Sequence, residues 1–283
     1  MATDLAIGRA ERPGGSRAIR LGLRTVALVY LGLLVAFPVS LMVRRAFEDG
    51  AGPAWDAITT PAALHALQLT AMIALIAVPL NAIFGVLVAL ALVRHRFRGK
   101  AVMSALIDLP LGVSPVVVGL ALIIVYGRNG WTGGWLLDHG IRVIFATPGM
   151  VLATLFVSVP FVAREVVPVL REIGTEQEEA ASTLGASSWQ TFRLVTLPAI
   201  RPAIGFGVVL TTARALGEYG AVSIVSGKLA GRTETLTLHV EERFQAFDLV
   251  GAYAASLVLA VMALATLALM HVVRRRADDH AGR

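Results

Sequence analysis

Six long apolar stretches limit what this chain can fold into more than any other feature of its sequence. They cover residues 25–43, 67–93, 101–126, 149–169, 204–225 and 249–273. A helix needs about 20 apolar residues to cross about 30 Å of membrane hydrocarbon, and the stretches are close to that length or longer. They lack the alternation of membrane β-barrel strands, so only helices satisfy their backbone groups. The sequence therefore predicts an all-α integral membrane protein with six transmembrane helices.

Basic residues are distributed unevenly between the connections. Of the 25 Lys and Arg residues, 17 lie before the first stretch, in the second and fourth connections or after the sixth stretch, and seven lie in the other connections. Such an excess marks the cytoplasmic side, so both termini are predicted to be cytoplasmic, with residues 1–24 as a tail beside the lipid headgroups. The first stretch is longer than a signal-peptide core and no A-x-A site follows it closely. We expect it to be retained.

Several function classes are excluded by what the sequence lacks. Without cysteine there is no disulfide, thiolate metal site or cysteine nucleophile. The net charge of +6 does not indicate a nucleic-acid partner, because 56% of the chain is hydrophobic and the basic residues flank apolar stretches. No G-x-x-x-x-G-K-[ST] loop occurs, and the six histidines show no metal-ligand spacing. We expect no catalytic residue, metal or cofactor on this chain, so uphill transport would need an ion gradient or a partner.

The fourth connection, residues 164–201, is long enough to have a structure of its own. Thr175 and Glu178 have the spacing of a capping box at a helix start, and Gly185 supplies a stop. Ser187 and Gln190 repeat the capping pattern for a second short helix. The first helix combines small residues with carboxylates, which suits close approach by another surface. A solvated amphipathic loop helix would have the same residue types.

The spacing within this connection is more specific than its composition. Glu179-Ala180-Ala181, then Gly185, then Val195-Thr196-Leu197-Pro198 resembles the EAA motif of ATP-binding-cassette importer permeases, with Val195 where that family usually has Ile. The resemblance implies that this loop docks on a cytoplasmic ATPase subunit through Glu179, Ala180, Ala181 and Gly185. It also implies that ATP and Mg²⁺ bind on that partner chain, so this chain is a transport subunit and not an enzyme.

Similarity to the sulfate/thiosulfate permeases of the CysW type extends from about residue 61 to the sixth stretch. It is carried by residues 106–117, 152–156, 160–165, 213–222, 231–236, 240–243 and 247–248. The resemblance implies the type I importer fold in a bacterial inner membrane, with a first helix and outer loop (25–65), a transmembrane core (66–273) and a cytoplasmic tail (274–283). It also implies a companion permease, two ATPase subunits and an extracytoplasmic sulfate- or thiosulfate-binding protein.

Other functions stay open at this point. A molybdate or tungstate permease of the same superfamily would share the block at residues 213–222, because these oxyanions have the charge and shape of sulfate. A secondary transporter would need no ATPase, and the coupling loop argues against it. A membrane-embedded enzyme would need a convergent acid–base or metal cluster, which the scattered histidines do not suggest.

Charged and polar residues inside the stretches are candidate functional residues, because burying them in a bilayer is costly. Arg214 and Glu218 lie one helical turn apart. They either neutralise each other or line the translocation pathway, where a guanidinium could bind a tetrahedral oxyanion. Asp108, Pro110, Ser114 and Pro115 predict a proline kink in the third stretch. We expect Asn81 to hydrogen-bond a neighbouring helix, and Arg164 and Glu165 to form an interfacial pair.

Overall fold

The computed structural model describes the backbone of residues 17–281 and the side chains of residues 21–268, and every regular element in this part of the chain is a helix. Residues 1–16 of the predicted N-terminal cytoplasmic tail lie outside the described residues. The side chains of the basic residues at 274–276 and 283 also lie outside them. The chain divides into two compact units, Met1–Arg45 and Ala46–Arg283.

The first unit contains one long apolar helix. α1 (Arg17–Leu31) continues through a π-helical turn (η1, Gly32–Ala36) into α2 (Phe37–Ala46). The segment Leu21–Ala46 has 26 residues, which is enough to cross a membrane, and its large apolar side chains are exposed. Such exposure is expected where side chains face lipid rather than a protein core.

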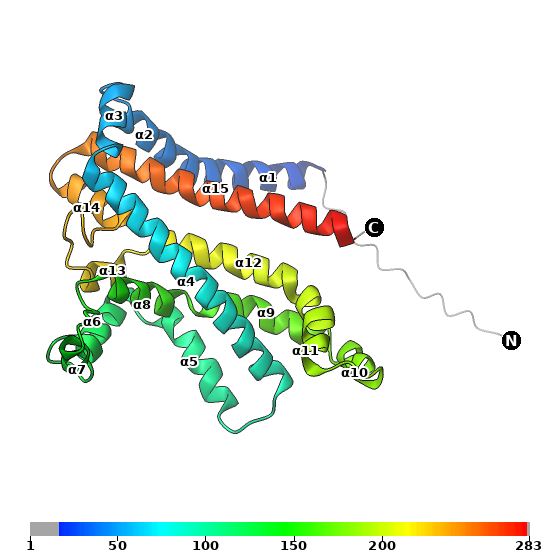
Figure 1. Ribbon diagram of the computed structural model, residues 1–283. Helices are drawn as coiled ribbons and strands as arrows, with labels where there is room; N and C mark the ends of the chain where they lie inside the picture. The colour runs from blue at the N-terminus through cyan, green and yellow to red at the C-terminus, as the bar shows by residue number, and fades with distance from the viewer. Residues whose placement is uncertain (1–16, 282–283) are drawn as a thin grey trace. The chain divides into compact units, whose positions relative to one another are not determined.

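Long helices form the framework of the second unit (Figure 1). These are α4 (Pro61–Arg94), α8 (Thr147–Ser158) running on into α9 (Pro160–Glu172), α12 (Leu197–Leu216) and α15 (Leu249–Ala281). The shorter helices are α3 (Ala51–Ile58), α5 (Lys100–Gly112), α6 (Pro115–Tyr126), α7 (Gly133–Asp138), α10 (Glu176–Thr183), α11 (Ser188–Thr191), the π-helical turn η2 (Phe192–Thr196), α13 (Gly220–Val225) and α14 (Leu236–Gln245). The predicted stretches 67–93, 149–169 and 249–273 each lie inside one continuous helical segment.

Small residues let α4, α9 and α12 approach one another closely. A Cβ atom on Gly85 would lie 2.7 Å from the Cβ of Val162, and one on Gly207 would lie 2.7 Å from the Cα of Val162. Val162 is therefore held between two glycines, one from α4 and one from α12. Close approach through small residues is a common way for membrane helices to associate, because lipid provides no hydrophobic driving force between them.

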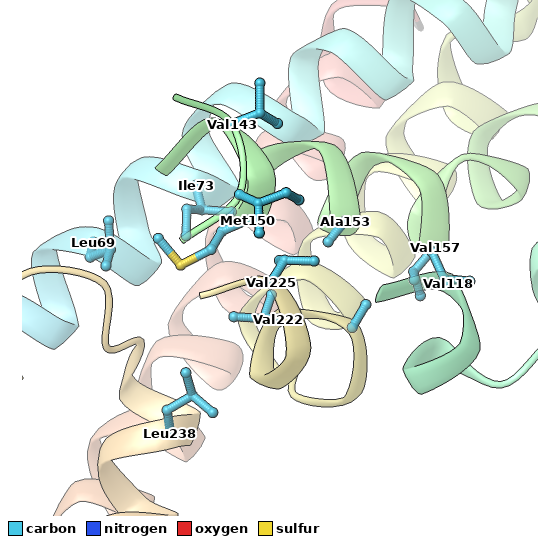
Figure 2. Packing of buried hydrophobic residues seen from close by; sticks show 12 residues of the cluster. Leu69, Ile73, Val118, Val143, Met150, Ala153, Val157, Val222, Val225 and Leu238 are labelled. Atoms are coloured by element: carbon cyan, nitrogen blue, oxygen red, sulfur yellow. The ribbon is translucent and has the colours of Figure 1, made fainter. Parts of the chain in front are cut away.

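A second set of buried apolar residues holds the opposite end of this unit together (Figure 2). Leu69 and Ile73 from α4 pack with Met150 from α8 and with Val222 and Val225 from α13. The same end carries α14 and α7, whereas α10 and α11 lie at the other end (Figure 1). Between these ends, Asn81 donates hydrogen bonds to Leu155 O at 3.1 Å and to Ser158 Oγ at 2.8 Å, which confirms its predicted role in joining helices.

The third predicted stretch is not the single kinked helix that we expected. α5 and α6 are separate helices bent by 115° at Val113–Ser114. At 13 and 12 residues they extend about 20 Å and about 18 Å, and neither alone would cross the hydrocarbon. Pro115 occupies the first position of α6, where its missing N–H leaves no intrahelical hydrogen bond unmade.

The fifth predicted stretch, residues 204–225, is also broken. α12 begins earlier, at Leu197, and ends at Leu216, and α13 begins at Gly220. Among the described residues, five helical segments are long and apolar enough to cross a membrane, and the pair α5–α6 makes a sixth if it is counted as one span.

Candidate functional site

The predicted functional residues fall in two places, which α12 connects. Glu179, Ala180, Ala181 and Gly185 lie in and just after α10, at one end of the second unit. Arg214 lies in the last turn of α12, and Glu218 lies in the break that follows it. The 20 residues of α12 extend about 30 Å, so the two groups cannot touch each other.

The coupling segment, which we define as residues 173–196, consists of α10, a glycine turn, α11 and η2. Gly185 has φ +86°, and the amides of Gly185 and Ala186 donate to the carbonyls of Ser182 and Ala181 at 3.0 Å each. This is the Schellman arrangement that ends a helix, and its left-handed position favours glycine. Glu179, Ala180 and Gly185 are exposed, and Ala181 is half-buried.

One of the two predicted capping boxes is wrong. The Thr175 side chain does not cap α10, because its hydroxyl donates to Glu179 Oε1 at 2.6 Å. The box at Ser187 is confirmed, since Gln190 N donates to Ser187 Oγ and Ser187 N donates to Gln190 Oε1. Glu178 is absent from the first box because it points toward α4.

Glu178 anchors the coupling segment to the end of α4. Arg94 forms an ion pair with Glu178, with Nε 2.8 Å from Oε2, and also donates to the carbonyls of Leu170 and Gly174. The buried Thr196 donates its hydroxyl to Glu178 Oε1 at 2.7 Å. One carboxylate therefore joins α4, α10 and η2. The sequence did not reveal this role, because Arg94 is 84 residues away in the chain.

We expect Glu178→Gln to loosen the coupling segment while leaving α4, α9 and α12 packed. The glutamine keeps the shape but weakens a charged hydrogen-bond network, which costs about 1–3 kcal/mol. Amide hydrogen exchange in residues 176–191 should become at least roughly fivefold faster. Glu176→Gln, an exposed carboxylate on the same helix, is the control. Equal exchange rates in the two variants would contradict the anchoring role.

The coupling segment also carries exposed apolar side chains. Leu184 is 89% exposed, Leu194 is 71% exposed and Trp189 is 66% exposed. They lie near the exposed Ala180 and Gly185 in the sequence, and the first turn of α10 carries three glutamates. Contiguous exposed apolar residues with a polar rim are typical of protein contact sites. The anchored segment thus has the composition of a docking surface.

At the end of α12, the predicted pairing of Arg214 with Glu218 is present. Arg214 Nη1 lies 2.7 Å from Glu218 Oε2, and Glu218 Oε1 accepts the backbone N–H of Ala221 at 2.8 Å. The Glu218 side chain is 1% exposed, whereas that of Arg214 is 31% exposed. Glu218 is thereby fixed in the break, and the Arg214 side chain stays partly exposed.

The two helix breaks pack against each other. A Cβ on Gly220, at the start of α13, would lie 2.9 Å from Pro115, at the start of α6. One turn further, a Cβ on Gly119 would lie 2.7 Å from the Cβ of Ile224. Irregular backbone at membrane depth occurs only where protein buries it or where it lines a water-filled path. The close contacts between the two breaks, beside Arg214, are consistent with the first of these cases.

Arg164 does not form the predicted pair with Glu165. Its Nε lies 2.9 Å from Asp108 Oδ1 on α5, and both side chains are about half exposed. The i to i+1 spacing on α9 points adjacent side chains in different directions, so Arg164 reaches across to the neighbouring helix. This pair borders a cavity of about 550 Å³ that Lys100 and Arg171 also line.

Known proteins share both the sequence and the fold. Residues 81–279 match the family described as binding-protein-dependent transport system inner membrane component. The chain is 47% identical to the sulfate transport system permease protein CysW of Synechocystis sp., over 90% of this chain and 92% of that protein. It is 46% identical to the protein of that name from Escherichia coli K12, over 90% of each. A bacterial alginate ABC transporter, 17% identical, has the same fold over 92% of this chain and 96% of its own, with a TM-score of 0.78.

Proposed function

This chain belongs to the family of binding-protein-dependent transport system inner membrane components, and from that premise we propose that it is a permease subunit of an ATP-driven sulfate importer. The family members are transport permeases and not enzymes. The observation that carries the proposal is the coupling segment, an exposed apolar and acidic surface anchored to α4 by Arg94 and Glu178. Sulfate is supported by relatives that are 46–48% identical over about nine-tenths of the chain. Thiosulfate is a second candidate substrate.

The partners follow from the same premise. Glu179, Ala180, Ala181 and Gly185 would contact a cytoplasmic ATPase subunit, which binds ATP and Mg²⁺. A companion sulfate permease, a second ATPase subunit and an extracytoplasmic sulfate- or thiosulfate-binding protein would complete the importer. Residues 164–201 hold the coupling loop, within a transmembrane core at 66–273. The first helix and outer loop at 25–65 precede this core, and tails at 1–24 and 274–283 flank the whole.

The topology that suits this role has six spans in a bacterial inner membrane, with α5 and α6 counted together and both termini in the cytoplasm. The excess of basic residues on one set of connections supports this orientation. α12 would connect the ATPase contact at one end to Arg214 at the other. Arg214 would offer its fork of N–H donors to a passing tetrahedral oxyanion.

We expect Glu179→Lys to reduce radiolabelled sulfate uptake at least tenfold when it replaces the wild-type chain in cells lacking it. A cation in place of an exposed carboxylate reverses the charge that an ATPase surface would meet, and like charges across an interface are strongly unfavourable. The ATPase subunit should also copurify less with this variant. Asp56→Lys reverses an exposed carboxylate on α3, outside the coupling segment, and should leave ATPase copurification intact.

Other outcomes would change the proposed coupling role or the proposed substrate. Full uptake by the Glu179→Lys variant would exclude the coupling role and favour a secondary transporter. Unlabelled thiosulfate and molybdate serve as competitors in the same assay. If cells that lack this chain take up sulfate at the normal rate but no longer take up molybdate, the substrate is molybdate or tungstate.

A further inference from the structure

A histidine and two glutamates meet at the start of α14, in residues that the transport proposal does not use. His239 Nδ1 lies 3.2 Å from Glu234 Oε1 and 3.9 Å from Glu242 Oε2. One ligand atom from each residue lies within 4.8 Å of the other two. In the part of the chain that the structure describes, this is the only group of three His, Asp or Glu side chains close enough to share an ion.

Two members of this group are buried, and one carboxylate oxygen has no hydrogen-bond partner. The side chains of His239 and Glu234 are 2% and 3% exposed. Glu234 Oε1 shares a 3.2 Å hydrogen bond with His239 Nδ1, whereas the buried Glu234 Oε2 has no hydrogen-bond partner among the described residues. A buried polar atom without a partner is costly, and an unseen ion is one common explanation. Glu242 is 58% exposed, so the group is open to solvent on one side.

The nearby cations are already paired with other carboxylates. Arg243 Nη1 lies 3.3 Å from Asp248 Oδ2, and Lys228 Nζ lies 2.7 Å from Glu241 Oε2. Neither of these two cations therefore forms an ion pair with the two carboxylates, Glu234 and Glu242. A divalent cation would balance the charge of these carboxylates.

The spacing of the three side chains fits a small tetrahedral metal ion. Zn²⁺ binds imidazole nitrogen and carboxylate oxygen at about 2.0–2.2 Å, so neighbouring ligand atoms lie about 3.3 Å apart. The two separations from His239, 3.2 Å and 3.9 Å, are close to that value, and the ligand oxygens of Glu234 and Glu242 lie within 4.8 Å of each other. We propose that Glu234, His239 and Glu242 bind one Zn²⁺ ion, with water as the fourth ligand on the exposed side.

Such an ion would fix the start of α14 against the rest of the second unit. Leu236 N donates to Thr70 Oγ1 on α4 at 2.8 Å, and Thr237 Oγ1 donates to the backbone oxygen of Glu218 at 2.9 Å. The ion would connect the loop before α14 to the first two turns of that helix. The first turn of α14 also contacts, through Thr237, the break that holds Glu218. Histidine spacing alone did not predict this site, because two of its three ligands are carboxylates.

The test is zinc binding by the full-length chain, purified in detergent with its metal removed by a chelator. We expect one equivalent of Zn²⁺ per chain in a calorimetric titration, and an upward shift of the thermal midpoint on adding Zn²⁺. His239→Gln and Glu242→Gln should each weaken binding at least tenfold. Glu242 is largely exposed, so its variant should fold even if the His239 variant does not.

Glu241→Gln is the matched control, because it removes the adjacent carboxylate, which faces Lys228 rather than the cluster. It should bind Zn²⁺ as tightly as the wild type. Absence of saturable binding to the wild type would overturn the proposal. Binding that survives in Glu242→Gln, or that falls equally in Glu241→Gln, would also overturn it. None of these readouts depends on which anion is transported.

Discussion

Arg214→Ala should abolish transport and destabilise the protein. The substitution leaves the Glu218 carboxylate, 1% exposed, with only the N–H of Ala221 as a partner. Removing one member of a buried ion pair costs about 3–5 kcal/mol, and the lower end applies here because Arg214 is 31% exposed. A cost of about 3 kcal/mol lowers the thermal midpoint by roughly 6–12 °C for a chain of this size. Uptake of labelled sulfate should fall at least a hundredfold.

Two further variants separate the structural role of Arg214 from a role in the translocation pathway. Arg214→Ala combined with Glu218→Gln removes both charges, so stability should recover while transport stays lost. Arg214→Lys keeps the positive charge, so the protein should stay folded. Because a lysine cannot offer the forked donors that suit a tetrahedral oxyanion, uptake should still fall at least tenfold. If the doubly neutral variant transports at the wild-type rate, the pair has only a structural role.

Gly207→Val should prevent stable packing of α12 against α9. The new Cβ would lie 2.7 Å from the Cα of Val162, which is a backbone atom that cannot move aside alone. Overpacking of this kind costs about 3 kcal/mol or more when two helix backbones must separate. We expect little full-length protein in membranes and a thermal midpoint at least several degrees lower for what remains.

Gly205→Val provides the matched control for this prediction. It lies on the same helix, two residues earlier, and a Cβ there would meet no heavy atom within 4 Å. Both variants add the same side chain and lose the same glycine flexibility, so any difference between them reports the contact with Val162. Similar membrane levels and thermal midpoints for the two variants would show that the helices tolerate separation at this point.

The local features of the coupling segment were largely predictable from its sequence. The stop at Gly185 and the capping box at Ser187 depend on residues within a few positions of each other, and both are present. The predicted capping box at Thr175 does not form, because its proposed partner, Glu178, instead pairs with Arg94 and accepts a hydrogen bond from Thr196. Local rules cannot include a competitor that approaches from a distant part of the chain.

The sequence by itself determined that the protein is a helical membrane protein, roughly where its long helices lie, and where the helix stop at Gly185 and the capping box at Ser187 lie. Those conclusions rest on composition, length and short-range spacing, because apolar runs in lipid must satisfy their hydrogen bonds internally. Only the tertiary structure decided that the third and fifth stretches are broken, that their breaks meet at Pro115 and Gly220, and that Arg94 holds Glu178. The cluster of Glu234, His239 and Glu242 likewise became visible only in three dimensions. Each of these features depends on side chains or backbones brought together by packing, and hydropathy along one chain does not encode which helix lies beside which.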